Sequence, residues 1–220
     1  MKLDPDTCRR IVWVSVFGVA FAFVESSVVV YLRSLYYPEG FTFPLKMMST
    51  SHIGVELARE AATVVMLAAV GILAGTTGWQ RFGYFLVVFG VWDVFYYVWL
   101  KVILDWPSAP TDWDVLFLLP LPWIGPVIAP ILISVLMIIC GGGMVLRIQR
   151  GLHFRPTLIS WLLGLAATLV AVYSFTHDVA ATLHAAMPSS YPYGFLVVSL
   201  VLYAVAYATA WMDYSGTRIS

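Results

Sequence analysis

The sequence is short of charge and almost free of cysteine. Only 11% of its 220 residues are Asp, Glu, Lys or Arg, whereas a soluble domain usually carries about 25%. The formal net charge is zero and no basic run occurs, so we expect no nucleic-acid partner. Two cysteines, Cys8 and Cys140, do not make a disulfide framework. What remains is 61% hydrophobic, with a mean hydropathy of +0.88, and indicates an integral membrane protein.

We expect no cleavable leader, and the sequence shows no long linker and no internal repeat. Asp4 and Asp6 stand among the bases of the N-terminal segment, and no small-residue cleavage site follows the first apolar run. We therefore interpret that run as a retained span rather than a signal peptide. We expect one polytopic membrane domain over residues 1–220.

Six apolar runs are long enough to cross a bilayer, since about twenty residues suffice for a helix. The fold class that we expect is all-α, a bundle of about six transmembrane helices. Pro120, Pro122, Pro126 and Pro130 interrupt the start of the fourth run. Proline removes a backbone donor and clashes with the preceding turn, so this start is either a kinked lead-in or a re-entrant segment. The expected spans are 11–32, 52–75, 82–104, 114–146, 157–177 and 192–213.

The basic residues are distributed unevenly between the two sides of these spans. Eight of the twelve Lys and Arg residues fall on the side of the two termini. The positive-inside rule then places both termini in the cytoplasm, and we expect a bacterial-type plasma (inner) membrane. The opposite connections are acidic and rich in Trp and Tyr, which suits an outer interface.

A cluster of ionisable residues opens the second expected span. His52, Glu56 and Glu60 stand at i, i+4 and i+8, so they project from one face of a helix. They cover roughly 12 Å of that face, too far for one metal ion but suitable for lining a cavity. Each ionisable group at membrane depth costs roughly 2.5 to 3.5 kcal/mol on insertion scales. The cluster therefore indicates a polar site inside the bundle.

Acids on three other spans reach the same half of the bilayer. In the expected topology Glu25 lies in the outer half of the first span, Asp93 near the middle of the third and Asp114 at the outer start of the fourth. Acids that only increase solubility would not lie at a common depth on separate helices. We therefore expect these acids and the second-span cluster to share one interior site, in a cavity that opens toward the outer face.

The charges of this site do not balance by themselves. Four carboxyl groups, from Glu25, Glu56, Glu60 and Asp93, face one fixed positive charge on Arg59. Either protons or a cation must neutralise the remainder. Carboxylates with one imidazole suit iron, manganese or zinc, and helical bundles are known hosts of such sites. The expected metal ligands are Glu25, His52, Glu56, Glu60 and Asp93.

Two members of the site also have structural interpretations. Asp114 could cap the fourth helix together with Thr111, as a variant of the capping box. His52 could be a polar residue at a helix end, because it lies at the interface.

Three further residues near the expected site, Arg59, Tyr96 and Tyr97, can also be interpreted in two ways. Arg59 could be a structural partner of Glu56 at i, i+3 spacing, or of Asp93 on the next helix. Tyr96 and Tyr97 follow Asp93 by three and four residues, so they could donate hydrogen bonds to the site or pack in an aromatic-rich helix.

Three functions are compatible with such a site, and we favour the first. It is a membrane-embedded enzyme acting on an apolar or lipid-like substrate, with Glu56, Glu60 and Asp93 as catalytic residues. A metal would serve as Lewis acid, water activator or redox centre, and a metal-free site would run acid–base chemistry, as in an isomerase or cyclase. The alternatives are a proton- or cation-coupled transporter that uses the same acids, and a structural subunit that pairs with a membrane-complex partner.

Overall fold

The computed structural model describes residues 5–41, 49–119, 121–180, 186 and 188–212. Within these ranges it contains six helices long and apolar enough to cross a membrane, and one small sheet. This confirms the expected set of six long apolar helices and is consistent with an integral membrane protein. The elements are α1 (Pro5–Tyr36), α2 (Thr50–Ala74), α3 (Gly78–Leu104), β1 (Trp113–Phe117), β2 (Trp123–Pro126), α4 (Ile128–Gln149), α5 (Leu158–Thr176) and α7 (Tyr193–Met212).

Hydroxyl side chains fix where three of these helices begin. Ser49, Thr77 and Thr157 each accept a hydrogen bond from the backbone N–H three residues later, at the starts of α2, α3 and α5. Such caps satisfy backbone donors that the first turn leaves unpaired. The apolar runs that follow then continue as helix for 19 to 27 residues.

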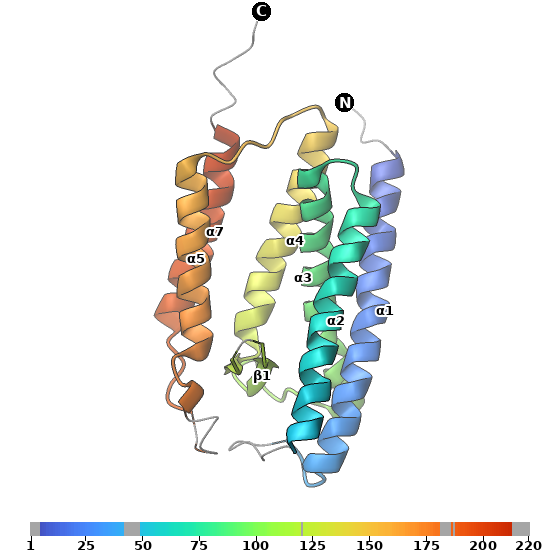
Figure 1. The fold of residues 1–220 in the computed structure, drawn as a ribbon, viewed down its shortest axis with the longest axis vertical. Helices are drawn as coiled ribbons and strands as arrows, with labels where there is room; N and C mark the ends of the chain where they lie inside the picture. The colour runs from blue at the N-terminus through green and yellow to red at the C-terminus, as the bar shows by residue number, and fades with distance from the viewer. Residues whose placement is uncertain (1–4, 42–48, 120, 181–185, 187, 213–220) are drawn as a thin grey trace, which may run out of the picture.

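The helices form two groups. Helices α1, α2, α3 and α4 pack side by side, and α5 and α7 form a separate pair beside them (Figure 1). Helix α1 begins and α7 ends at the same end of the molecule, which we call the terminal end. The sheet lies at the opposite end, the hairpin end, with the last turn of α1 and the first turn of α2. The first group therefore encloses the region where the predicted acids lie.

The fourth expected span, 114–146, needs a correction. Its first part is an antiparallel hairpin of β1 and β2, and α4 begins only at Ile128. Pro126 ends β2 opposite Trp113, a position where a missing ladder donor does least harm. Pro130 lies in the first turn of α4, where its missing N–H needs no partner. The capping role considered for Asp114 is also wrong, because this residue lies within β1.

Glycine allows α3 and α4 to approach each other closely. A Cβ atom added at Gly141 would lie 2.5 Å from the carbonyl oxygen of Gly83. One added at Gly90 would lie 2.5 Å from the carbonyl oxygen of Ser134. Small residues at such positions let two helix backbones come into contact. This contact holds Ser134 of α4 beside the centre of α3.

We expect Gly141→Ala to destabilise the protein by about 1–3 kcal/mol, because the added methyl group overpacks this contact. Thermal unfolding of the purified protein measures the change. Gly142→Ala is the matched control on the next residue, where an added Cβ meets nothing within 4 Å. It should be neutral, or stabilising by up to about 1 kcal/mol through its better helix propensity. Equal behaviour of the two variants would contradict the close contact.

Candidate functional site

A cavity of about 190 Å³ lies at the hairpin end, enclosed by α1, α2, α3 and β1. We call it the acidic cavity. Every acid that the sequence analysis placed in a shared site lines it, although these acids come from four elements. Two arginines line it too. Its charged members are Glu25, Arg33, Glu56, Arg59, Glu60, Asp93 and Asp114.

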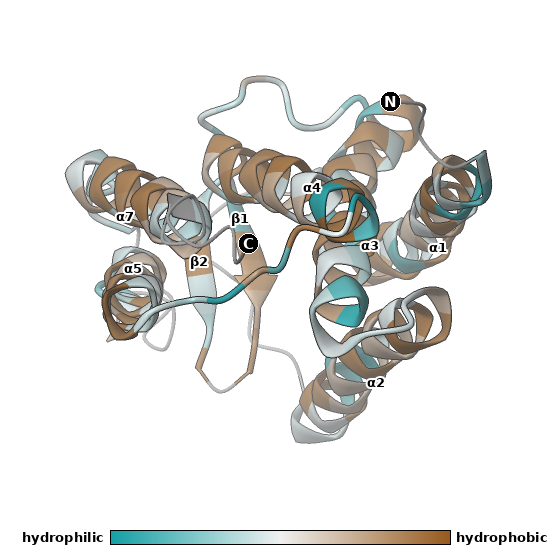
Figure 2. Ribbon diagram, turned by 90° about the horizontal axis from the view of Figure 1, so that it is seen from above, coloured by the Kyte–Doolittle hydropathy of each residue, from teal (hydrophilic) through white to brown (hydrophobic). Residues whose placement is uncertain are grey.

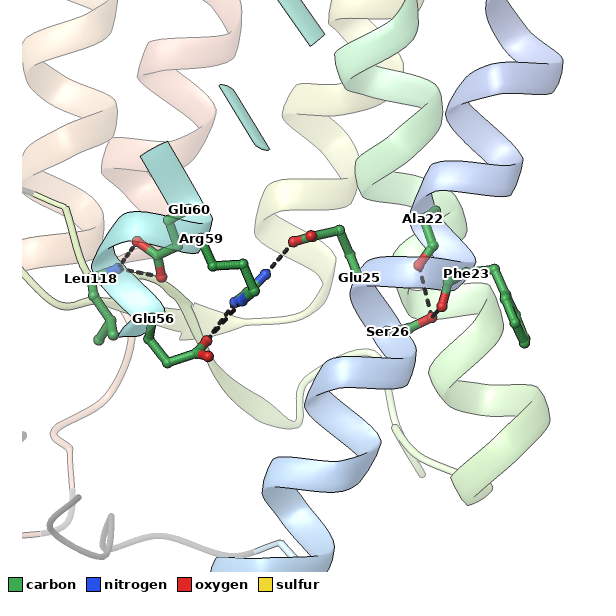
Figure 3. A network of polar contacts seen from close by, with 8 residues as sticks. All are labelled: Ala22, Phe23, Glu25, Ser26, Glu56, Arg59, Glu60 and Leu118. Atoms are coloured by element: carbon green, nitrogen blue, oxygen red, sulfur yellow. Dashed lines mark hydrogen bonds and ion pairs between the residues drawn. The ribbon is translucent and has the colours of Figure 1, made fainter. Parts of the chain in front are cut away.

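Arg59 connects two of these acids. Its Nε and Nη2 atoms donate to Oε2 of Glu56 at 2.9 and 2.7 Å, and its Nη1 donates to Oε2 of Glu25 on α1 (Figure 3). Both carboxyl groups are buried, and the Arg59 side chain is 22% exposed. The expected pairing with Glu56 is thus confirmed, and Glu25 takes the place considered for Asp93. One guanidinium is therefore the ion-pair partner of two buried carboxyl groups, and its single charge balances one of them.

Glu60 binds the backbone of the hairpin instead of a cation. Its two carboxyl oxygens accept from the N–H of Leu118, just after β1, at 3.0 and 2.9 Å (Figure 3). Glu60 is buried, and no ion pair with it occurs among the residues that the structure describes. Its carboxyl group thus ties α2 to the hairpin while it faces the acidic cavity.

Asp93 is the acid that α3 contributes to the cavity. Its Oδ2 atom accepts a hydrogen bond of 2.8 Å from the hydroxyl of Ser134 on α4, across the glycine contact described above. In the described part of the chain no lysine or arginine forms an ion pair with it. Asp93 and Glu60 are thus two buried carboxyl groups of one cavity that form no ion pair with any described residue.

Aromatic rings form much of the remaining wall. Trp92 and Phe117 lie with ring centroids 6.3 Å apart, and Tyr96 and Tyr97 at 5.0 Å. All four side chains line the acidic cavity. Tyr96 and Tyr97 therefore belong to the site region, as the spacing from Asp93 allowed. The cavity combines carboxyl groups with π faces.

Arg33 joins the hairpin to α1. Its Nη2 atom lies 3.0 Å from Oδ1 of Asp114, and both side chains are buried. The guanidinium carbon lies 4.1 Å from the ring centre of Phe41 and 3.7 Å from that of Trp106. Sequence analysis counted Arg33 only as a base on the outer side and missed this role. The available signal was an arginine at the end of an apolar helix, with an acid at the start of the fourth apolar run.

His52 does not join the acids. It lies on the exposed side of the first turn of α2, and its Nδ1 shares a hydrogen bond with the hydroxyl of Tyr36 on α1. It is not part of the cavity wall. The spacing from Glu56 is helical as expected, but His52 stands one turn further out, beyond the rim of the cavity.

The expected iron, manganese or zinc site is not supported. No group of three or more His, Cys, Asp or Glu side chains in the described ranges could hold one metal ion. The physical reason is the way the carboxyl groups are used. Glu25 and Glu56 turn to Arg59, Glu60 to a backbone N–H and Asp93 to a hydroxyl. The chemistry present is therefore that of carboxyl groups, guanidinium groups and aromatic rings.

Comparison with known proteins found no match to the chain among protein families, curated proteins or solved structures.

Proposed function

We propose that this chain is a membrane-embedded enzyme that moves protons to and from carbon atoms of an apolar, unsaturated, lipid-like substrate. The reaction class is an isomerisation or cyclisation of double bonds. The observation that carries the proposal is the acidic cavity, in which Asp93 and Glu60 have no cationic partner among the described residues and lie beside an aromatic wall.

The placement in a membrane rests on the helices and on the bases. Six helices are long and apolar enough to span a bilayer. Basic residues gather at the terminal end, whereas Arg33 at the hairpin end is buried in an ion pair. By the positive-inside rule the terminal end faces the cytoplasm, in a plasma membrane of bacterial type. The acidic cavity then lies in the outer half of the bilayer.

The charges of the cavity favour a neutral substrate. Five carboxyl groups and two guanidinium groups line it, so full ionisation would leave three negative charges uncompensated, five minus two. A low-dielectric site does not hold such an excess, so protons must neutralise part of it. An anionic head group would be repelled, while an apolar chain that becomes transiently cationic would be stabilised.

The size of the cavity limits how much substrate it takes. About 190 Å³ is less than the roughly 300–1,000 Å³ of pockets that enclose a drug-sized ligand. The cavity therefore receives one end of a chain or one ring, and the remainder of the substrate lies among lipids.

Asp93 and Glu60 have complementary roles in this proposal. Asp93 donates its proton to one carbon of a double bond, so that a C–H bond forms from the π electrons and the neighbouring carbon becomes positive. The π faces of Trp92 and Phe117 stabilise this charge by cation–π attraction. Glu60 then removes a proton from the next carbon, and the released electron pair forms the shifted double bond. No oxidant or reductant is needed, and solvent at the hairpin end restores both protonation states.

An apolar layer below the cavity favours an enzyme over a transporter. Toward the terminal end, the space between α1, α2 and α3 is filled by Ala22, Leu67, Val87 and Val88, all buried. Proton transport requires a continuous series of polar groups across the bilayer. The four side chains of this layer carry no polar atom, and outside the cavity wall the buried member of the same cluster that does is Tyr84, whose single hydroxyl makes no continuous series. The carboxyl groups therefore serve a local site.

The experiment uses deuterium, because exchange at carbon reveals the reaction even when the substrate has not been identified. The purified protein in lipid nanodiscs is incubated with a total lipid extract in deuterated buffer, and mass spectrometry detects lipids that gain deuterium at carbon. Wild-type protein should label one lipid class. Asp93→Asn and Glu60→Gln should reduce its labelling rate on the order of 100-fold or more, the usual contribution of a general acid or base.

Asp112→Asn is the matched control. Asp112 lies in the connection before β1, outside the cavity wall. Burial alone would raise its pKa, but hydrogen bonds from Ser108 and Ala109 outweigh this and lower the pKa of Asp112. This variant should label lipids like wild type. If wild-type protein labels no lipid, the proposal is overturned. In that case, proton uptake by proteoliposomes in a pH gradient would establish transport if the Asp93→Asn substitution abolishes it. Absence of proton uptake by the wild-type protein would indicate a structural subunit.

A further inference from the structure

A second cavity, of about 900 Å³, lies at the terminal end between α3 and α4 on one side and α5 and α7 on the other. We call it the apolar groove. It shares no lining residue with the acidic cavity, and its walls consist mostly of aliphatic and aromatic side chains. Representative members from all four helices and the α4–α5 connection are Trp79, Leu136, Met144, Phe154, Trp161 and Tyr207.

The connection between α4 and α5 closes one end of this groove. It runs across the space between the two helices at the terminal end, and parts of it are strongly hydrophilic (Figures 1 and 2). Phe154 and Pro156 of this connection line the groove. Arg155 stands between them in the sequence, with an exposed side chain. At this end of the groove an exposed cation, Arg155, therefore lies between two residues of the apolar wall.

Two further arginines lie at the start of the same connection. Arg147 is in the last turn of α4, and Arg150 is the residue that ends it; both are exposed. The Arg147 guanidinium lies 4.5 Å from the ring centre of Trp211 on α7, so it reaches across toward the other helix pair. Over the described ranges, none of Arg147, Arg150 and Arg155 forms an ion pair with a carboxylate. Among the described residues, the end of the groove thus carries three positive charges that no ion pair neutralises.

We propose that the apolar groove binds an acyl chain of an anionic phospholipid, whose phosphate is held by Arg147, Arg150 and Arg155. The volume of the groove lies at the upper end of the range for ligand pockets. The combination of an apolar groove and a basic rim is complementary to a molecule with a long apolar tail and a negative head. Basic pockets between helices on the cytoplasmic side bind such head groups through the same attraction. This site depends on the placement in a membrane and not on the acid–base chemistry proposed for the acidic cavity.

Native mass spectrometry tests the head group. The whole chain in mild detergent is mixed with phosphatidylglycerol or with phosphatidylcholine of identical chains, and the lipid retained after release from the micelle is counted. Wild-type protein should retain phosphatidylglycerol preferentially. The triple variant Arg147→Gln, Arg150→Gln and Arg155→Gln should lower its retention on the order of tenfold or more, to the level of phosphatidylcholine.

Gly164 of α5 provides the test of the groove itself. It lines the groove, and a Cβ added there meets nothing within 4 Å. Gly164→Phe should therefore fill the groove without displacing backbone, and it should lower the retention of both lipids. Gly142→Phe is the control, since Gly142 of α4 is equally open but lies outside the groove wall. It should leave lipid retention unchanged.

Alkylation of Cys140 tests occupation of the groove without the Gly164→Phe substitution. Cys140 lines the groove, so in a Cys8→Ser background its alkylation by a maleimide should slow when phosphatidylglycerol is added. Three outcomes overturn the proposal. They are equal retention of the two lipids by wild type, retention by Gly164→Phe like that of wild type, and a dimer of the chain that Gly164→Phe dissociates, because a second copy would then occupy the groove.

Discussion

Replacing Arg59 with methionine is expected to lower the free energy of unfolding by about 3–5 kcal/mol, because it leaves two buried carboxyl groups without their cation. Glu25 and Glu56 both depend on this guanidinium, and both are buried at the interface of α1 and α2. Removal of one partner from a buried ion pair costs more than the pair itself contributes, since the remaining charge stays desolvated. Unfolding by SDS in mixed micelles measures the change.

The control for this prediction removes all three charges together. The variant Arg59→Met, Glu25→Gln and Glu56→Gln keeps the shape of the cluster without a buried charge, so it should recover most of the lost stability. Arg59→Lys should recover only part, because one ammonium group cannot reproduce the three hydrogen bonds of the guanidinium. Unchanged stability in Arg59→Met would contradict the central role of this residue.

Arg33→Ala is expected to release the hairpin from α1. Asp114 would lose its cation while buried, and Phe41 and Trp106 would lose the guanidinium that lies against both rings. The expected cost is about 3 kcal/mol or more, and it should appear first as local opening. Hydrogen–deuterium exchange of the backbone amides of β1 and β2 measures it, and their protection should fall before that of the helices.

Lys101→Ala serves as the comparison at the same end of the molecule. Lys101 forms an ion pair of 2.7 Å with Asp105, but both side chains are largely exposed, 49% and 92%. Exposed pairs contribute little because solvent screens them, so the hairpin amides should exchange as in wild type. Wild-type protection in Arg33→Ala would show that the strands are held by other contacts.

The helices could be predicted from the sequence because their signal is local. A run of about twenty apolar residues specifies a spanning helix by its length alone. The expected boundaries of four spans lie within four residues of α2, α3, α5 and α7, whereas α1 extends beyond the expected 11–32 at both ends. The hairpin could not be predicted in this way. Its strands are short and lie within the fourth apolar run, where Pro122 and Pro126 were interpreted as breaks in a helix. The pairing of Trp113 with Pro126 is a contact that no helical periodicity reveals.

The candidate site was predictable in its acids and less so in their partners. Glu56 and Glu60 share a face through helical spacing, and Glu25 and Asp93 could be assigned to the same region by depth. The partners of these acids depend on how the helices are placed. The Leu118 N–H lies 58 residues from Glu60 and carries no side-chain signal, and Ser134 meets Asp93 only because glycine brings α3 and α4 together.

The two ties of the hairpin also determine when the site can exist during synthesis of the chain. Asp114 is synthesised 81 residues after its partner Arg33, and Leu118 is synthesised 58 residues after its partner Glu60. Until the segment after α3 has been made, an arginine and a glutamate stand on finished helices with no partner, and contacts of such long sequence separation form slowly. The cavity is therefore completed late, when the hairpin docks between helices already in place. A nascent chain that ends at α3 therefore carries both residues without these partners.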